Sequence, residues 1–232
     1  MNFIQQNVFK KLRADFFQTG ENLDPMTRFK RNKLLELLKN VKEAPVGAVA
    51  LTNPVLNNRF KRIQEEEPHQ IDTNMDTVTL LRIIVTNVNA MLNAGINLKG
   101  IIQLGQYLRT KGDKVDFVKL DSWLTTLHIQ RLAQLQGSIL ITFFEFDADE
   151  IPFVRHLERG AYKLTLRSLY HTIKDYQEEW HFKQSQTGFV HNNSKMLRRN
   201  LKRSMRYFGY APIETTSNFL HNFARSLSEI EE

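Results

Sequence analysis

Apolar residues recur at helical spacing along most of the chain, and the pattern is clearest between Ala94 and Phe153. In this stretch it predicts three short helices that share one buried seam: 98–111, 117–127 and 129–144. Gly95 ends the helix that precedes them. The stretch therefore indicates a helical scaffold at the centre of the chain.

The same spacing predicts helices before and after this centre. They cover residues 3–17, 26–41, 54–67, 75–92, 154–182, 195–208 and 215–230. Asn and Asp side chains can accept hydrogen bonds from the free N–H groups of a helix start, so they mark several of these starts. The candidate caps are Asn53, Thr73 or Asn74, and Asp113 or Asp116.

One run, Ser138–Phe146 with the sequence SILITFFEF, is locally strand-like because it is rich in β-branched and aromatic residues. A minor strand near residues 139–146 is therefore an alternative to helix there. We expect an all-α or mainly α fold, a single domain over residues 1–232 with eight to ten helices. Its weakest internal boundary is predicted at residues 66–74, where the sequence is most similar to a linker.

Composition allows a large core and excludes two kinds of covalent site. The chain has 232 residues, of which 41% are hydrophobic, including 16 Phe. It has no Cys, so disulfides and zinc–thiolate sites are excluded. No apolar run reaches the roughly 18–20 residues of a transmembrane helix, and the N-terminal sequence lacks the features of a signal peptide. We expect a cytoplasmic protein.

The formal charge of +7 is concentrated in one segment. Between Glu179 and Glu214 there is no acidic residue, but there are seven basic ones. They are Lys183, Lys195, Arg198, Arg199, Lys202, Arg203 and Arg206. The basicity is therefore a property of one surface and not of the whole chain.

The predicted helix at residues 194–208 separates this charge from an apolar stripe. On a helical wheel the stripe holds Leu197, Leu201, Ser204, Met205 and Phe208. The residues on the basic side, with two tyrosines nearby, are the candidate anionic-ligand site: Lys195, Arg198, Arg199, Lys202, Arg203, Arg206, Tyr207 and Tyr210. Such a face can bind a nucleic-acid backbone, an anionic lipid surface or a nucleotide-sugar pyrophosphate. A solvated face on a packed helix, paired with acidic stretches such as Glu65–Glu67 or Glu229–Glu232, is the alternative.

Residues that would indicate catalysis or metal binding do not form a recognisable pattern. The only Asp-x-Asp spacing is Asp147-Ala148-Asp149, in an acidic turn before Pro152, where capping of the next helix is the simpler interpretation. The histidines are scattered, without a nucleophile–base arrangement. We predict no catalytic residue, no metal and no cofactor.

Two segments resemble a known family. GINLKGIIQLGQYLRTKGDKVDFVKLDSWLTTLHIQRLAQLQGSILITFFEFDADEIPF and FKKLRADFFQTGENLDPM resemble helical regions of the uncharacterised nucleotidyltransferase family, whose members often lie among bacterial surface-polysaccharide genes. The resemblance implies a catalytic core with a Gly-rich turn and an Asp-x-Asp metal site. The place for it, between Asn53 and Met75, holds only about 20 residues, a length typical of a connection and not of a domain, and contains no Gly. The catalytic core is therefore predicted to be missing.

These observations favour a non-enzymatic helical scaffold or interaction protein, derived from that family and acting in a bacterial polysaccharide or envelope context. Its expected partner is another protein or a second copy of itself. The alternative is a protein that binds nucleic acid or another anionic ligand through residues 194–208. A residual nucleotidyltransferase is the third reading, and it requires Asp147 and Asp149 to converge on a nucleotide pocket.

Overall fold

The computed structural model describes residues 1–170 and 194–228, with side chains described for 1–170 and 201–224. Within these residues the fold is all-α, with short 3-10 turns between helices and no strand. The α-helices are α1 (Phe3–Phe17), α2 (Arg28–Glu43), α3 (Pro54–Glu66), α4 (Met75–Ala94), α5 (Leu98–Lys111), α6 (Phe117–Thr126), α7 (Gln130–Phe144), α8 (Gly160–Ser168), α10 (Ser194–Phe208) and α11 (Pro212–Ser228). The all-α prediction is confirmed.

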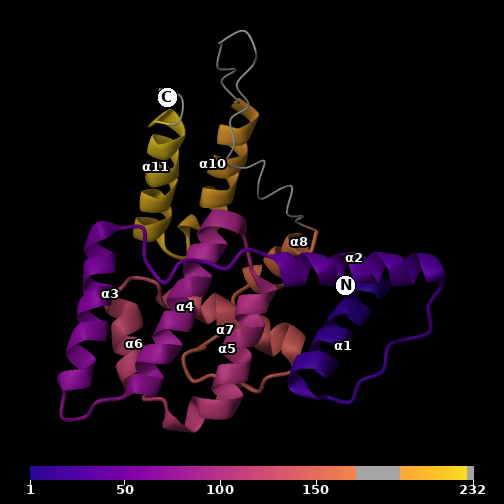
Figure 1. The fold of residues 1–232 in the computed structure, drawn as a ribbon, viewed down its shortest axis with the longest axis horizontal. Coiled ribbons are helices and arrows are strands. Elements are labelled where there is room, and N and C mark those ends of the chain that lie inside the picture. The colour runs from indigo at the N-terminus through magenta and orange to yellow at the C-terminus, as the bar shows by residue number, and fades with distance from the viewer. Residues whose placement is uncertain (171–193, 229–232) are drawn as a thin grey trace.

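Helix α4 runs through the middle of the body and contacts α5, α6 and α7 (Figure 1). It is apolar on most of its circumference: Leu80, Leu81, Ile84, Val85 and Val88 are each fully buried. A helix that is hydrophobic nearly all round belongs in a core, and each such side chain contributes about 1.5–3 kcal/mol relative to an exposed one. α4 is therefore a core helix, which α5, α6, α7, α10 and α11 all contact.

Side-chain caps fix where the central helices begin. Asn53 accepts hydrogen bonds from the first N–H groups of α3, with Pro54 at the first helical position. Asn74 caps α4 and Asp116 caps α6 in the same way. These caps are as predicted, and each is worth about 1 kcal/mol.

Residues 139–144 belong to α7, so the alternative of a minor strand near residues 139–146 is wrong. Ile139, Leu140, Phe143 and Phe144 are buried on one face, which is the spacing of a helix and not of a strand. Packing of that face against the core outweighs the local strand preference of the run. The helix ends at Glu145, which takes a left-handed conformation with φ 57°.

The helix predicted over residues 154–182 begins later, at Gly160. Residues 151–159 instead form an irregular segment over α7, where the absent Cβ of Gly137 leaves space for Ile151 and Val154. A Cβ at Gly137 would lie 2.3 Å from Cγ2 of Val154. Residues 171–182 of that prediction lie outside the described part of the chain.

The segment predicted as the weakest internal boundary, residues 66–74, is tied to the body by a buried carboxylate. Glu67 is 1% exposed and accepts a 2.8 Å hydrogen bond from Nζ of Lys119 on α6. It also accepts from the backbone N–H of Asn74, the cap of α4, at 2.7 Å. The connection between α3 and α4 is thereby held against α6.

Candidate interaction site

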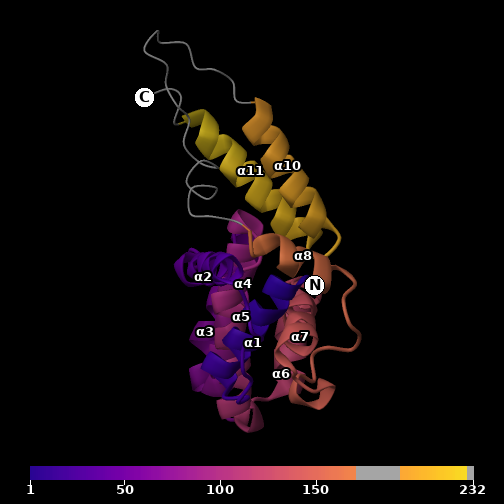
Figure 2. The ribbon, with the colours of Figure 1, turned by 90° about the vertical axis from the view of Figure 1, so that its right-hand side faces the viewer.

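Helices α10 and α11 form a hairpin that projects from one end of the helical body (Figures 1 and 2). The two helices lie side by side in both views. Gly209, Tyr210 and Ala211 connect them, and the backbone N–H groups of the last two donate to the carbonyl of Tyr207 at 2.9 and 3.2 Å. Pro212 suits the first position of α11, because its fixed φ is helical and it lacks the N–H that would go unpaired there.

The hairpin contacts the body through polar side chains. Glu214, in the first turn of α11, is 1% exposed. Its carboxylate accepts hydrogen bonds from the backbone N–H groups of Thr52, through Oε1, and of Asn53, through Oε2 at 3.0 Å. The side chain of Asn53 also donates to Oγ of Ser217 at 2.8 Å. The start of α11 is therefore bonded to the start of α3.

Asn93, near the end of α4, is a second point of attachment. Its Oδ1 accepts from Nδ2 of Asn218 at 3.0 Å and from Nδ2 of Asn222 at 3.1 Å. Its backbone carbonyl accepts a hydrogen bond from the Arg203 guanidinium of α10. A cation at the C-terminal end of α4 also suits the negative end of the helix dipole. Both helices of the hairpin are thus joined to the end of α4.

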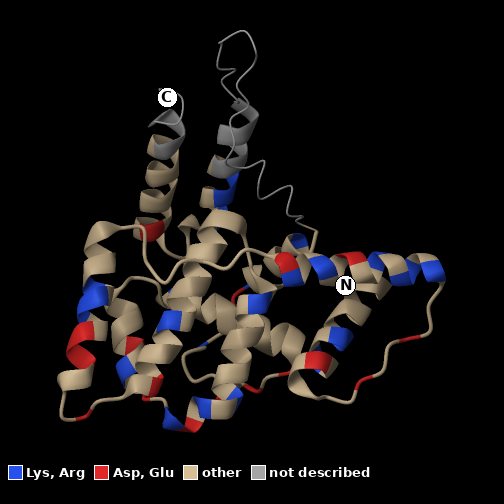
Figure 3. Ribbon diagram, viewed as in Figure 1, with Lys and Arg blue, Asp and Glu red and all other residues tan. Residues whose placement is uncertain are grey.

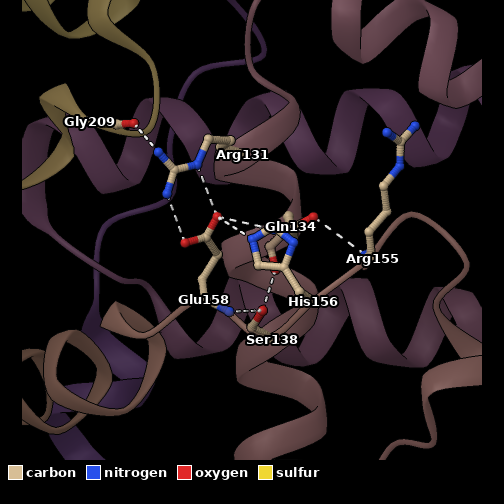
Figure 4. Close-up of polar contacts among 7 residues, drawn as sticks. All are labelled: Arg131, Gln134, Ser138, Arg155, His156, Glu158 and Gly209. Atoms are coloured by element: carbon tan, nitrogen blue, oxygen red, sulfur yellow. Dashed lines mark hydrogen bonds and ion pairs between the residues drawn. The ribbon is translucent and has the colours of Figure 1, made fainter.

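An ion pair between Arg131 of α7 and Glu158, in the irregular segment before α8, holds the turn between the two helices (Figure 4). Arg131 donates to both carboxylate oxygens of Glu158 at 3.0 Å, and Glu158 is 7% exposed. Arg131 also donates to the carbonyl of Gly209 at 2.6 Å, and its guanidinium lies 5.0 Å from the centre of the Tyr210 ring. The hydrogen bonds to Glu158 raise the pKa of Arg131, so the guanidinium stays charged. Burial, followed by the Glu158 carboxylate, raises the pKa of Tyr210.

Further hydrogen bonds fix the Glu158 carboxylate in this position. Gln134 donates to Oε1 of Glu158 at 3.1 Å and lies 3.0 Å from Nε2 of His156. The backbone N–H of Glu158 donates to Oγ of Ser138 at 3.0 Å. Figure 4 shows all of these groups directed toward Glu158, so the charge that holds the turn is itself fully bonded. The network therefore works as a structural clamp on the turn.

The face of α11 opposite the body is apolar and exposed. Ile213 is 42% exposed, Leu220 is 56% exposed and Phe223 is 39% exposed. Around the helix axis, the mean direction of these three side chains lies about 170° from that of Glu214, Asn218 and Asn222. An amphipathic surface helix normally buries its apolar face, and here the polar face is inward. This reversal is the main feature of the hairpin.

Helix α10 shows the same reversal in the part whose side chains are described. The predicted apolar stripe is exposed, at 45% for Leu201, 69% for Met205 and 54% for Phe208. Arg203 and Tyr207, at 6% and 2% exposed, instead face the body.

The eight residues of the candidate anionic-ligand site do not all lie on one open surface. Lys202 is exposed, and Arg206 and Tyr210 are half-buried. Burial of Arg203 and Tyr207 leaves these two little surface for a ligand. The side chains of Lys195, Arg198 and Arg199 lie outside the described part of the chain.

A second basic region lies on α2, outside the segment in which the net charge is concentrated. Figure 3 shows Lys and Arg along much of this helix. The residues are Arg28, Lys30, Arg31, Lys33, Lys39 and Lys42. Lys33 and Lys39 pair with Glu36 and Glu43 of the same helix, so part of this charge is neutralised locally.

The acidic turn does not cap the next α-helix, which begins only at Gly160, and instead closes a single 3-10 turn, Ala148–Glu150. The side chain of Asp147 accepts from the turn's backbone while Glu150 accepts from the N–H of Asp147 at 2.8 Å, a capping box. Asp149 and Glu150 line a surface hollow of about 420 Å³, whose lining does not include Asp147. Among the described residues no three His, Asp or Glu side chains are grouped to hold a metal ion. Asp149 therefore lines this hollow without Asp147.

Comparisons of the chain with protein-family models, curated proteins and solved structures gave no match. The resemblance to the nucleotidyltransferase family therefore stays a prediction. In the part of the chain that the structure describes, no helix is both long and apolar enough to cross a bilayer.

Proposed function

We propose that this chain is a non-enzymatic helical scaffold whose α10–α11 hairpin binds a protein partner. The observation that supports the proposal is the reversed polarity of the hairpin. Glu214, Asn218 and Asn222 are hydrogen-bonded to the body, while Leu220 and Phe223 are exposed. Exposed apolar surface on a well-anchored element is typical of a protein-binding site.

The geometry favours a protein over an anionic ligand at this site. An anionic ligand would require the basic side chains to face solvent together, with the tyrosines accessible for stacking. Arg203 donates to the carbonyl of Asn93 instead, and Tyr207 is buried. The proposed origin of the scaffold, a nucleotidyltransferase-like helical region without its catalytic core, rests on the sequence resemblance.

The experiment is a capture assay with three immobilised baits: the wild-type chain, Leu220→Glu and Leu35→Glu. Leu35 lies on α2 and is 55% exposed, against 56% for Leu220, so it is a matched control for an added charge at an exposed leucine. Proteins captured from a lysate of the source organism are quantified by mass spectrometry, and an additional copy of this same chain counts as a partner.

We expect wild type and Leu35→Glu to retain the same partner. Leu220→Glu should retain at least about tenfold less, because a carboxylate in an apolar interface costs more than about 1.4 kcal/mol. Equal capture by wild type and Leu220→Glu would refute the proposal. Capture of nucleic acid that declines steeply with salt would favour the anionic-ligand alternative.

A further inference from the structure

The apolar stripe of α11 has the spacing of a helix-pairing seam. Ile213, Thr216, Leu220 and Phe223 follow one another at intervals of three, four and three residues. This is the a/d spacing of a heptad, which places all four side chains along one line facing a partner helix. All four are exposed in the structure. The partner that best fits the stripe is therefore another helix.

No positively charged residue lies on the part of α11 whose side chains are described. Between Tyr207 and Ala224 there is no Lys or Arg, and the neighbours of the stripe on the helix include Ser217, His221 and Asn222. Helices that lie on a membrane surface carry Lys and Arg along their polar face. On α11 that face instead holds groups already bonded to the body, such as Glu214. A bilayer surface is therefore a poor match for the α11 stripe.

The stripe is complementary to a copy of itself. The intervals three, four, three read the same in both directions, with their centre at Asn218. In an antiparallel pair Ile213 would face Phe223 of the second copy, and Thr216 would face its Leu220. Each layer would then combine a larger with a smaller side chain, which is how helix cores fill space. A two-fold pairing of this kind closes on itself without leaving a second stripe exposed.

The exposed area is enough for a reversible dimer. The six apolar side chains on the hairpin are Leu201, Met205, Phe208, Ile213, Leu220 and Phe223. With about 200 Å² for a fully exposed side chain of this size, they present on the order of 600 Å². Two copies that cover each other's stripes would bury about 1,200 Å² in total, the lower end of the range for specific complexes.

Resting on the proposed function, we propose that the partner of the hairpin is a second copy of this chain, paired through the apolar side chains that α10 and α11 expose, with the α11 stripe Ile213–Phe223 at the centre of the interface. Because the area lies at the lower end of the range for specific complexes, we expect a weak, reversible dimer, with a dissociation constant on the order of 1–100 µM. The fraction of the chain that is dimeric should therefore change over micromolar concentrations of the chain.

The test is sedimentation velocity of the full chain at about 1–300 µM, a range that brackets the expected constant. Wild type and Leu35→Glu should shift with concentration from the 27.2 kDa monomer toward twice that mass. Leu220→Glu should have a dissociation constant at least tenfold higher. A wild type that stays monomeric throughout, or a Leu220→Glu variant that dimerises as wild type does, would overturn the inference.

Cross-linking gives a second readout that does not depend on a disruptive charge. The chain has no Cys, so a single introduced thiol reports one position. The Leu220→Cys variant should form a covalent dimer with a short bis-maleimide reagent, and Leu35→Cys should not. Equal yields for the two variants would contradict the pairing.

The failure of this inference can be separated from the failure of the proposed function. If the wild type is monomeric and Leu220→Glu still loses capture of a different protein, the proposed pairing of two copies is wrong but the proposal of a protein-binding hairpin stands. If Leu220→Glu changes neither association nor capture, both are wrong.

Discussion

Replacement of Glu214 tests whether the polar attachment of the hairpin is as strong as its geometry indicates. The carboxylate is 1% exposed and accepts from the backbone N–H groups of Thr52 and Asn53. These are the residues just before α3, so Glu214 bonds the start of one helix to the start of another. Glu214→Ala removes both acceptors, and Glu214→Gln retains one while placing an NH₂ group opposite the other N–H.

The expected loss follows from the unpaired groups. Each buried N–H left without an acceptor costs about 1–3 kcal/mol. We expect Glu214→Ala to lower the free energy of unfolding by about 2–4 kcal/mol, since water can reach part of the vacated space. Glu214→Gln should lose about 1–2 kcal/mol, because one hydrogen bond remains but its charge does not. For a chain of this size each kcal/mol lowers Tm by about 2–4 °C.

Urea unfolding followed by circular dichroism measures the global loss, and hydrogen exchange measures the local one. Exchange at the amides of Thr52 and Asn53 should accelerate by a factor on the order of 30 or more in Glu214→Ala, equivalent to 2 kcal/mol. Glu65, exposed on α3, gives the control Glu65→Gln, which should stay within about 0.5 kcal/mol of wild type. A Glu214→Ala variant within the same margin, with unchanged exchange at residues 52 and 53, would refute the reasoning.

Two further predictions concern other polar groups. Arg131→Met should lower the free energy of unfolding, measured in urea, by about 2–3 kcal/mol, less than for a fully buried pair because the Arg131 side chain is 54% exposed. Adding Glu158→Gln should restore part of this loss, because it removes the unpaired carboxylate. If the double variant recovers nothing, an unpaired buried carboxylate is not the cause. Burial, and then the hydrogen bond to Asp76, raise the pKa of Tyr107 from 10.0 to about 12. The folded state therefore retains a proton that the unfolded state loses, so the free energy of unfolding should decrease as pH rises from about 10 to 12. In urea titrations, the free energy of unfolding of Tyr107→Phe should decrease less between about pH 10 and 12 than that of wild type. An identical pH dependence for the two would contradict the raised pKa of Tyr107.

The sequence predicted the helices well because their signals are local. Asn53, Asn74 and Asp116 cap the helices that immediately follow them, and their hydrogen bonds reach only a few residues ahead. The run Ile139–Phe146 was ambiguous, since its β-branched and aromatic composition favours a strand locally. This run forms part of helix α7 because of its packing against distant parts of the core, which the local sequence does not show.

The orientation of the hairpin could not be predicted in the same way. Glu214, Asn218 and Asn222 recur at intervals of four, a polar stripe visible in the sequence. Their partners Thr52, Asn53 and Asn93 lie more than 120 residues away, as the separations of 161 to Asn53 and 125 to Asn93 show. The sequence therefore showed an amphipathic helix but did not indicate which face is inward. The clamp between Arg131 and Glu158 had no recognisable sequence signal.

The central claim is that α11 turns its polar face to the body and its apolar face outward, and thiol labelling tests it directly. Thr215 is 1% exposed, and its buried hydroxyl has no hydrogen-bond partner among the described residues, so Thr215→Cys should fold without a lost bond. Leu220 is 56% exposed. In dilute native protein, Leu220→Cys should react with maleimide at nearly the rate of a free thiol, and Thr215→Cys should react at least about 100-fold more slowly, corresponding to more than 2.7 kcal/mol of protection. Equal rates, or faster labelling at position 215, would contradict the account.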